Sequence, residues 1–112
     1  MGCLFIIKEG RRRRYIGFKI FLSKDITVDK KDMINALKQQ CRKKLKKELK
    51  DLGIFLIRFD GHLGIVRCNH IEKDNTIDLL NSLNYVSSQK VKIETIGTSG
   101  TIKSLIKKHM NN

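Results

Sequence analysis

The spacing of apolar residues changes along the chain, and each change predicts a different structural element. From Arg14 the residues alternate, with one side carrying Ile16, Phe18, Ile20 and Leu22 and the other Tyr15, Gly17, Lys19 and Phe21. A period of two is typical of a strand with one buried face. We therefore expect a half-buried strand from Arg14 onward.

After this strand the apolar spacing becomes three and four, which is the period of a helix. Asp29 is a good N-cap, and Gly53 accepts the left-handed conformation that ends a helix. These signals predict one long helix from Asp29 to about Leu52. Its apolar stripe consists of Met33, Ile34, Leu37, Cys41, Leu45, Leu49 and Leu52.

A β-hairpin is expected next, with strands at Ile54–Asp60 and Ile65–Cys68 and a tight connection over residues 61–64. Alternation sorts its side chains between the two faces. The side chains expected to face the helices are those of Phe55, Ile57, Phe59, Val66 and Cys68. The opposite face would then hold Leu56, Arg58, Ile65 and Arg67.

The last third predicts a helix over Ile71–Leu83, a strand near Lys90–Ile96, a turn at residues 97–100 and a final helix that ends near Met110. Ile77, Leu80 and Leu83 should point inward, and Ser99 or Thr101 could cap the final helix. The order β-α-β-β-α-β is the α+β, ferredoxin-like (RRM-like) plan, with an antiparallel sheet and an added C-terminal helix. That helix, with the stripe Ile102, Leu105, Ile106 and Met110, is one possible cover for the second face of the sheet.

The length of the chain and its charge limit the number of domains and the classes of partner. A chain of 112 residues suits one domain, here residues 14–112 behind a basic arm over residues 1–13. The formal charge of +13 favours a polyanionic partner. Nucleic acid is the first candidate, and an anionic membrane surface is the second. Charge alone also allows a ribosomal or chaperone-like protein.

The basic residues fall into a few groups. Four arginines stand at positions 11–14, and within residues 42–47 only Leu45 is uncharged. A solvated tail and a solvated helix face are the plain alternatives to RNA contact. Arg58 and Arg67 either contact phosphate or pair with Asp60 or Glu94. The third strand lacks paired aromatic residues, so base stacking on the sheet is not expected.

Other chemistries find little support in the sequence. Three cysteines without a C-x-x-C spacing, and only Cys68 and His70 close together, argue against both disulfides and a zinc site. Asp60 and His62 could form an acid–base pair, but a turn explains them better. The segment at residues 97–101 lacks P-loop spacing, although its N–H groups and hydroxyls could bind phosphate. No apolar run approaches the ~20 residues that a membrane helix needs.

Three segments resemble one known family. Phe59-Asp60-Gly61-His62-Leu63-Gly64-Ile65-Val66-Arg67-Cys68-Asn69-His70 is similar to the central hairpin of the ribonuclease P protein component 2 family, the small "processing of precursors" subunit, in its archaeal form. Thr98-Ser99-Gly100-Thr101-Ile102-Lys103 resembles its C-terminal signature, and Arg14-Tyr15-Ile16 the opening of its first strand. The resemblance covers roughly residues 13–110.

The resemblance implies an RRM-like sandwich that binds the catalytic RNA of ribonuclease P, in the cytoplasm or, if the source is eukaryotic, in the nucleus and nucleolus. The holoenzyme is an endoribonuclease that removes the 5′ leader from precursor tRNA. The RNA performs this hydrolysis with Mg²⁺, so no catalytic residue, bound cofactor or protein metal site is expected in this chain. The expected protein partner is ribonuclease P protein component 3, with self-association in a two-plus-two assembly and no membrane contact.

Charge and resemblance together predict an RNA-binding set, and the apolar faces of the C-terminal helix and of the hairpin predict a protein-interface set. The RNA-binding residues are Arg11, Arg12, Arg13, Arg14, Lys38, Arg42, Lys43, Lys46, Lys47, Arg58, Arg67, Ser99, Thr101 and Lys103. The interface residues are Leu56, Ile65, Ile102, Leu105 and Ile106.

Three alternatives stay open. One is a generic RNA-binding or chaperone module of the same fold, and another is a stand-alone nuclease. The third is a lipid-anchored protein, because Met1-Gly2-Cys3 near the arginines imitates a dual-acylation signal. Ile6 stands where that signal usually has Ser or Thr.

Overall fold

The computed structural model describes residues 12–22 and 27–110. Along these residues the strands are β1 (Arg13–Leu22), β2 (Phe55–Phe59), β3 (Leu63–Asn69), β4 (Tyr85–Val86) and β5 (Gln89–Ser99). The helices are α2 (Lys30–Leu45), α3 (Lys73–Ser82) and α4 (Ile102–Leu105), which continues as a π-helical turn, η3 (Ile106–Met110). Short 3₁₀ turns, η1 (Lys50–Leu52) and η2 (His70–Glu72), precede β2 and α3.

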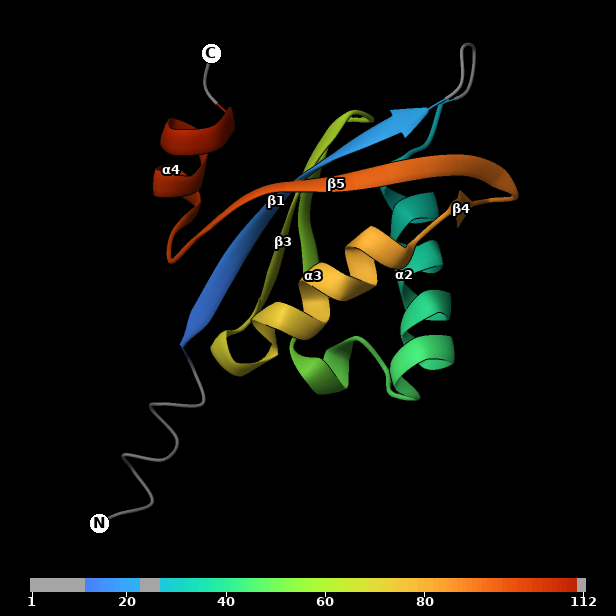
Figure 1. Ribbon diagram of the computed structural model, residues 1–112, viewed down its shortest axis with the longest axis horizontal. Helices are drawn as coiled ribbons and strands as arrows, with labels where there is room; N and C mark the ends of the chain where they lie inside the picture. The colour runs from blue at the N-terminus through green and yellow to red at the C-terminus, as the bar shows by residue number, and fades with distance from the viewer. Residues whose placement is uncertain (1–11, 23–26, 111–112) are drawn as a thin grey trace.

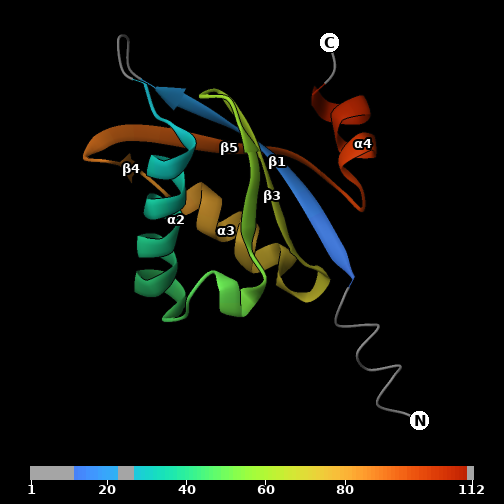
Figure 2. The same ribbon diagram turned by 180° about the vertical axis from the view of Figure 1, so that it is seen from behind.

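The strands form one five-stranded antiparallel sheet in the order β2-β3-β1-β5-β4. Helices α2 and α3 cover one face, and α4 packs against β1 and β5 from the other side (Figures 1 and 2). This is the ferredoxin-like α+β arrangement predicted from the sequence, with the C-terminal helix as cover for the second face. The short strand β4 is an addition that the sequence pattern did not predict.

The main core lies between the sheet and helices α2 and α3. The first strand contributes Ile16, Phe18 and Ile20, which are at most 2% exposed, as its alternation predicts. Phe18 lies opposite Gly64 in the neighbouring strand and stacks on Phe59 at a centroid distance of 6.0 Å. A side chain at position 64 would overlap the Phe18 ring, so the aromatic packing requires glycine there.

Helix α2 begins as predicted but ends earlier than predicted. The Asp29 carboxylate accepts a hydrogen bond of 2.8 Å from the Asp32 N–H, which makes Asp29 the N-cap. The helix stops at Leu45, and Lys46 takes a left-handed conformation (φ 57°). The prediction of one helix to Leu52 is therefore wrong. Leu49 and Leu52 still reach the core, but from a separate turn that ends at Gly53 (φ 68°).

The predicted faces of β2 are also wrong over its first half. Its pairing with β3 shifts between Leu56 and Arg58, which places a β-bulge at Ile57. Before the bulge Leu56 pairs with Val66 and lies in the helix-side core, whereas Phe55 pairs with Arg67 and is 44% exposed. After the bulge the predicted phase returns, because Arg58 lies opposite Ile65 and Phe59 contacts the core.

A second, smaller buried region lies under α4. Ile65 and Leu105 are both fully buried yet stand outside the helix-side cluster. The chain enters α4 through Thr101, whose hydroxyl accepts a bond of 3.2 Å from the Ser104 N–H. The expected turn at residues 97–100 is shorter than predicted, because β5 continues through Ser99. Within the described residues, no helix is long and apolar enough to cross a membrane.

Candidate nucleic-acid interface

Several predicted RNA-binding residues meet at one end of the sheet, where β1 starts and where β3 and β5 finish. The strand register sets Arg13 opposite Asn69, and Tyr15 opposite both Arg67 and Ser99. The Arg12 carbonyl accepts a bond of 2.8 Å from the His70 N–H, which ties the arginine segment to the end of β3. We call the residues at this end the sheet-end cluster: Arg12, Arg13, Arg14, Arg67, Ser99, Thr101 and Lys103.

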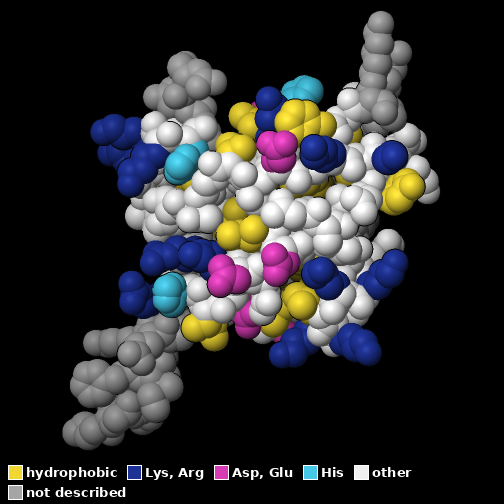
Figure 3. Space-filling model, in the orientation of Figure 1, with side chains coloured by type: hydrophobic (Ala, Val, Ile, Leu, Met, Phe, Trp, Pro, Cys, Tyr) yellow, Lys and Arg dark blue, Asp and Glu magenta, His cyan; other side chains and the backbone are white. Residues whose placement is uncertain are grey.

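The glycine between β5 and α4 brings two of these segments together. An Arg14 guanidinium nitrogen lies 3.1 Å from the position that a Cβ on Gly100 would occupy. The Arg14 side chain therefore reaches the backbone just before Thr101, although positions 14 and 100 are 86 residues apart in the sequence. In Figure 3, basic side chains gather at the start of β1 and again over α4, along the same side of the molecule.

Charges in the sheet-end cluster lack acidic partners within the described residues. The ion pairs found across residues 12–22 and 27–110 are Arg42–Glu48 and Lys92–Glu94, and neither involves the cluster. Arginine guanidinium groups pair well with phosphate oxygens, often through two parallel bonds. A cluster of basic side chains without acidic partners is well suited to bind a polyanion.

Helix α4 adds basic residues that the sequence analysis missed. A shallow hollow is lined by Thr101, Lys103, Ser104, Lys107 and Lys108. Lys103, Lys107 and Lys108 are all exposed. The spacing of four between Lys103 and Lys107 places both on one helix face, and this signal could have identified Lys107 as part of the surface.

A second basic surface surrounds the end of α2. Lys38, Lys43, Lys46 and Lys47 are exposed along this helix and just beyond its end. Arg42 is different, because its Nε and Nη2 donate to the Glu48 carboxylate at 2.7 and 2.9 Å. The bond from Arg42 lowers the pKa of Glu48, and the same pair raises the pKa of Arg42. A phosphate must therefore compete with Glu48 for Arg42.

The two basic surfaces do not merge. The end of α2 lies on the helix side of the sheet, while the start of β1 and helix α4 lie at the opposite end of the molecule (Figures 1 and 2). The structure thus brings Arg12–Arg14 together with Arg67, Ser99, Thr101 and Lys103, but not with the lysines of α2. Arg11, the preceding arm and Met1–Cys3 lie outside the described residues.

Arg58 and Arg67 lie on the outer face, as predicted, and neither is paired with Asp60 or Glu94 within the described residues. The Arg67 guanidinium lies over the Phe55 ring, 5.1 Å from its centroid. This contact holds the guanidinium plane at the edge of the sheet and leaves its N–H donors available to a ligand. Arg58 is exposed on β2, which two strands separate from β5.

The hairpin tip has a structural role. The Asp60 Oδ1 accepts bonds from the backbone N–H groups of Leu63 (2.8 Å) and His62 (2.9 Å). These two bonds, with that from Leu63 the stronger influence, lower the pKa of the Asp60 carboxyl. Gly61 takes the left-handed conformation (φ 99°) that closes the turn. The turn interpretation of Asp60 and His62 therefore accounts for both residues.

The structure divides the predicted interface residues. Leu56 belongs to the helix-side core, so its placement on the outer face is wrong, and the bulge at Ile57 is the reason. Ile65 and Leu105 are covered within the chain. Ile102 and Ile106 are half-buried on α4 and remain partly accessible.

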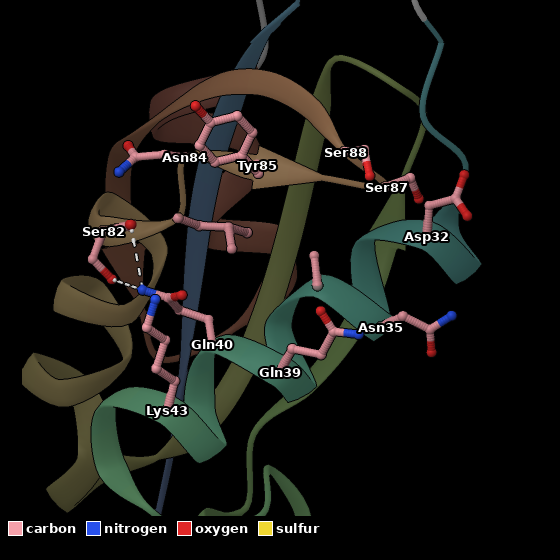
Figure 4. A pocket seen from close by; sticks show the side chains of 12 residues that line it. Asp32, Asn35, Gln39, Gln40, Lys43, Ser82, Asn84, Tyr85, Ser87 and Ser88 are labelled. Carbon is pink, nitrogen blue, oxygen red and sulfur yellow. Dashed lines mark hydrogen bonds between the residues drawn. The ribbon is translucent and has the colours of Figure 1, made fainter.

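A polar groove lies between α2 and the β4–β5 hairpin (Figure 4). On its floor the Gln40 amide donates to the Ser82 hydroxyl at 3.1 Å and to the Ser82 carbonyl at 3.4 Å. Asp32 and Lys43 are its charged lining residues, and Figure 4 places them at different ends. Across the described residues, no three His, Cys, Asp or Glu side chains come together as a metal site.

A family model and two individual proteins match this chain over most of its length. The model of the Rpp14/Pop5 family matches residues 14–110. The chain is 33% identical over 99 residues to ribonuclease P protein component 2 of Archaeoglobus fulgidus, covering 88% of this chain and 89% of that protein. It is 31% identical over 110 residues to ribonuclease P protein component 2 of Pyrococcus furiosus, covering 89% and 84%.

A solved structure has the same fold. A chain in the cryo-EM structure of yeast ribonuclease MRP superimposes with a TM-score of 0.64 at 14% sequence identity, covering 81% of this chain and 76% of the yeast chain.

Proposed function

Because this chain belongs to the Rpp14/Pop5 family, we propose that it is an RNA-binding subunit of ribonuclease P that supports removal of the 5′ leader from precursor tRNA. The observation that carries the proposal is the sheet-end cluster. Arg13, Arg14 and Arg67 lie where β1 starts and β3 finishes, Arg14 reaches Gly100 just before Thr101, and none of the three has an ion-pair partner among the described residues.

The proposed partner of this cluster is the phosphate backbone of the ribonuclease P RNA. Folding of a large RNA brings its phosphates together, and bound cations must offset their repulsion. Arginine and lysine side chains that displace counterions supply part of this neutralisation. The protein would therefore stabilise the active RNA fold and lower the Mg²⁺ concentration at which that fold forms.

The chemistry is assigned to the RNA. A Mg²⁺-activated water attacking the phosphodiester would belong to the RNA active site, and the protein would act through the fold of the RNA. Asp60 and His62, the one acid–base candidate found in the sequence, are engaged in the hairpin turn or exposed beside it. This supports an architectural role for the chain.

The assembly is proposed to contain ribonuclease P protein component 3 and two copies of this chain. Ile102 and Ile106 on α4 are the accessible members of the predicted interface set. Leu105 anchors α4 to the sheet, so a charge at position 105 would test folding as well as assembly. Ile102→Asp and Ile106→Asp are the better tests of a partner contact.

The experiment is reconstitution of this chain with component 3 and the cognate RNA on precursor tRNA, titrating Mg²⁺. The test variant is Arg13→Ala/Arg67→Ala, and the matched control is Lys90→Ala/Lys92→Ala on the opposite half of the sheet. We expect the test variant to need more Mg²⁺ and to weaken RNA binding, with the salt slope falling by about 0.9 for each phosphate that is no longer neutralised. Equal behaviour of the two variants would remove the sheet-end cluster from the RNA interface.

A generic RNA-binding protein is the remaining alternative, and the same assay separates it. Such a protein would bind unrelated structured RNAs as tightly as the ribonuclease P RNA and would leave the Mg²⁺ requirement of cleavage unchanged. Cleavage of precursor tRNA by the purified protein without RNA would instead establish a nuclease and overturn the assignment of chemistry.

A further inference from the structure

A groove with an apolar floor lies between α2 and the start of β2, on the far side of the helix from the polar groove of Figure 4. Its volume is about 390 Å³. The floor is formed mainly by apolar side chains, and the charged residues stand at its margin. Its lining includes the apolar residues Ile34, Leu37, Leu49 and Phe55 and the basic residues Lys38 and Lys50.

The groove adjoins the outer edge of the sheet. Strand β2 comes first in the sheet order, so within the described residues no strand lies along its outer side. Proteins commonly protect such edges with a bulge or a lysine. Here the bulge at Ile57 and the Lys30 ammonium, 3.3 Å from the Ile57 carbonyl, protect the second half of β2. The first half, at Phe55 beside the groove, has neither device.

Exposure of the apolar side chains also favours a ligand at this place. Phe55 is 44% exposed, although its ring is large and apolar. Ile34 is half-buried on the neighbouring helix. Partial exposure of both residues at one groove leaves apolar surface that a partner would remove from water.

The margin of the groove is positive. Lys38 and Lys50 are exposed there, and the single carboxylate of the lining, Glu48, is engaged by Arg42 at 2.7 and 2.9 Å. A partner with carboxylates on both sides of its apolar residues would therefore meet two lysines that have no ion pair among the described residues. RNA phosphates could also bind the lysines, but RNA would bury little apolar surface against the floor of the groove.

We propose that this groove binds an apolar segment of another protein that is flanked by aspartate or glutamate side chains. The groove adjoins the sheet-end cluster at Phe55, whose ring carries the Arg67 guanidinium. It also shares Lys38 with the basic surface at the end of α2. Apolar side chains of the segment would cover Ile34 and Phe55 beside the buried Leu37, and its carboxylates would approach Lys38 and Lys50.

The test uses the full chain and synthetic peptides, with binding followed by backbone NMR. The probe alternates leucine with glutamate. A second peptide has serine for leucine, so that it keeps the charge and loses the apolar surface. A third has lysine for glutamate. Because the chain carries a charge of +13, the serine peptide measures the unspecific attraction of any acidic peptide.

We expect the leucine–glutamate peptide to shift the amide signals of Ile34, Leu37 and Phe55 and to bind about tenfold more tightly than the serine peptide. Ile34→Gln should remove this advantage, whereas Ile71→Gln, at a residue that is 77% exposed elsewhere, should keep it. Lys50→Glu should weaken the glutamate peptide and strengthen the lysine peptide, with Lys31→Glu as the charge control.

Two results would overturn the proposal. One is an Ile34→Gln variant that is folded, by its melting temperature, and binds the leucine–glutamate peptide as the Ile71→Gln variant does. The other is a single-stranded RNA probe that shifts the groove amides more strongly than the peptide, which would assign the groove to nucleic acid.

Discussion

The imidazole of His109 lies against Gly97, so closely that a methyl group at position 97 would overlap the ring. Gly97 stands opposite Gly17 in the β1–β5 pairing. Because neither glycine has a side chain, the outer face of the sheet has a shallow depression here. The C-terminal helix packs into this depression. The packing of α4 depends on the absence of side chains as much as on the buried Leu105.

Gly97→Ala should lift the C-terminal helix from the sheet. The added methyl cannot be accommodated unless His109 moves, and overpacking of this kind typically costs about 1–3 kcal/mol. Hydrogen exchange should increase over residues 102–110 while β1 and β3 stay protected. His109→Ala in the same chain should restore most of the protection. If Gly97→Ala alone leaves exchange unchanged, the contact does not hold the helix.

Glu48→Gln should strengthen RNA binding at the end of α2. The substitution removes the carboxylate charge and one of the two oxygens that accept from Arg42, so Arg42 is held less tightly. A phosphate contact by Arg42 would then steepen the salt dependence of binding by about 0.9. Glu94→Gln removes the same charge from the weaker Lys92 contact at 4.0 Å and serves as the control. Equal effects of the two variants would mean that only net charge matters.

Asp60 should make the hairpin sensitive to acid. Its pKa is lowered in the folded chain by the Leu63 and His62 N–H groups, so its contribution to stability is complete above the unfolded pKa of about 4 and is lost as pH falls through the lower folded value. Asp60→Ala should cost about 1 kcal/mol or less at neutral pH, because the site is exposed. Asp60→Asn should keep most of the stability and lose its acid dependence. Chemical denaturation at several pH values measures both.

Cys41 and Cys68 should react slowly with iodoacetamide in the native protein. Both are fully buried, and burial is the main cause that raises the pKa of each thiol. Alkylation, followed peptide by peptide with mass spectrometry, should be slower than in urea by at least about a hundredfold. Fast native labelling at Cys68 would show that β3 is less protected than its position beside α3 indicates.

The sequence pattern predicted most of the fold, because the spacing of apolar residues matches the period of the strand or helix that buries them. It failed at the end of α2, where Leu49 and Leu52 continue the helical spacing but reach the core from a separate turn. The repulsion of adjacent basic side chains over residues 42–47 disfavours a continued helix, and the turn lets Glu48 fold back onto Arg42. The apolar spacing alone cannot show that charge repulsion and the Glu48–Arg42 bond outweigh continuation of the helix.

The faces of β2 were mispredicted for a different reason. A bulge adds one residue to a strand and reverses the phase of everything before it. Nothing in Phe55-Leu56-Ile57 reveals which apolar residue is the extra one, because all three suit a buried position. Only the pairing with Val66 and Arg67 decides that Leu56 points inward and Phe55 outward.

The candidate interface could be predicted residue by residue but not as one surface. Charge identified the arginines at the start of β1, and the resemblance added Arg67 and the segment from Ser99 to Lys103. The strand register places them at one end of the sheet, whereas the lysines of α2 belong to another surface. Arg42 was expected to be available, and its bond to Glu48 required the turn after α2.

The central position of β1 also has a consequence for synthesis on the ribosome. This strand leaves the exit tunnel first, yet its two neighbours are β3, at residues 63–69, and β5, which ends at Ser99. The sheet cannot close until the residues up to Ser99 have emerged, because loop closure over so many residues precedes the contacts that reward it. Until then the apolar side of β1 stays exposed, so the nascent chain is expected to need a chaperone or an early partner at this stage.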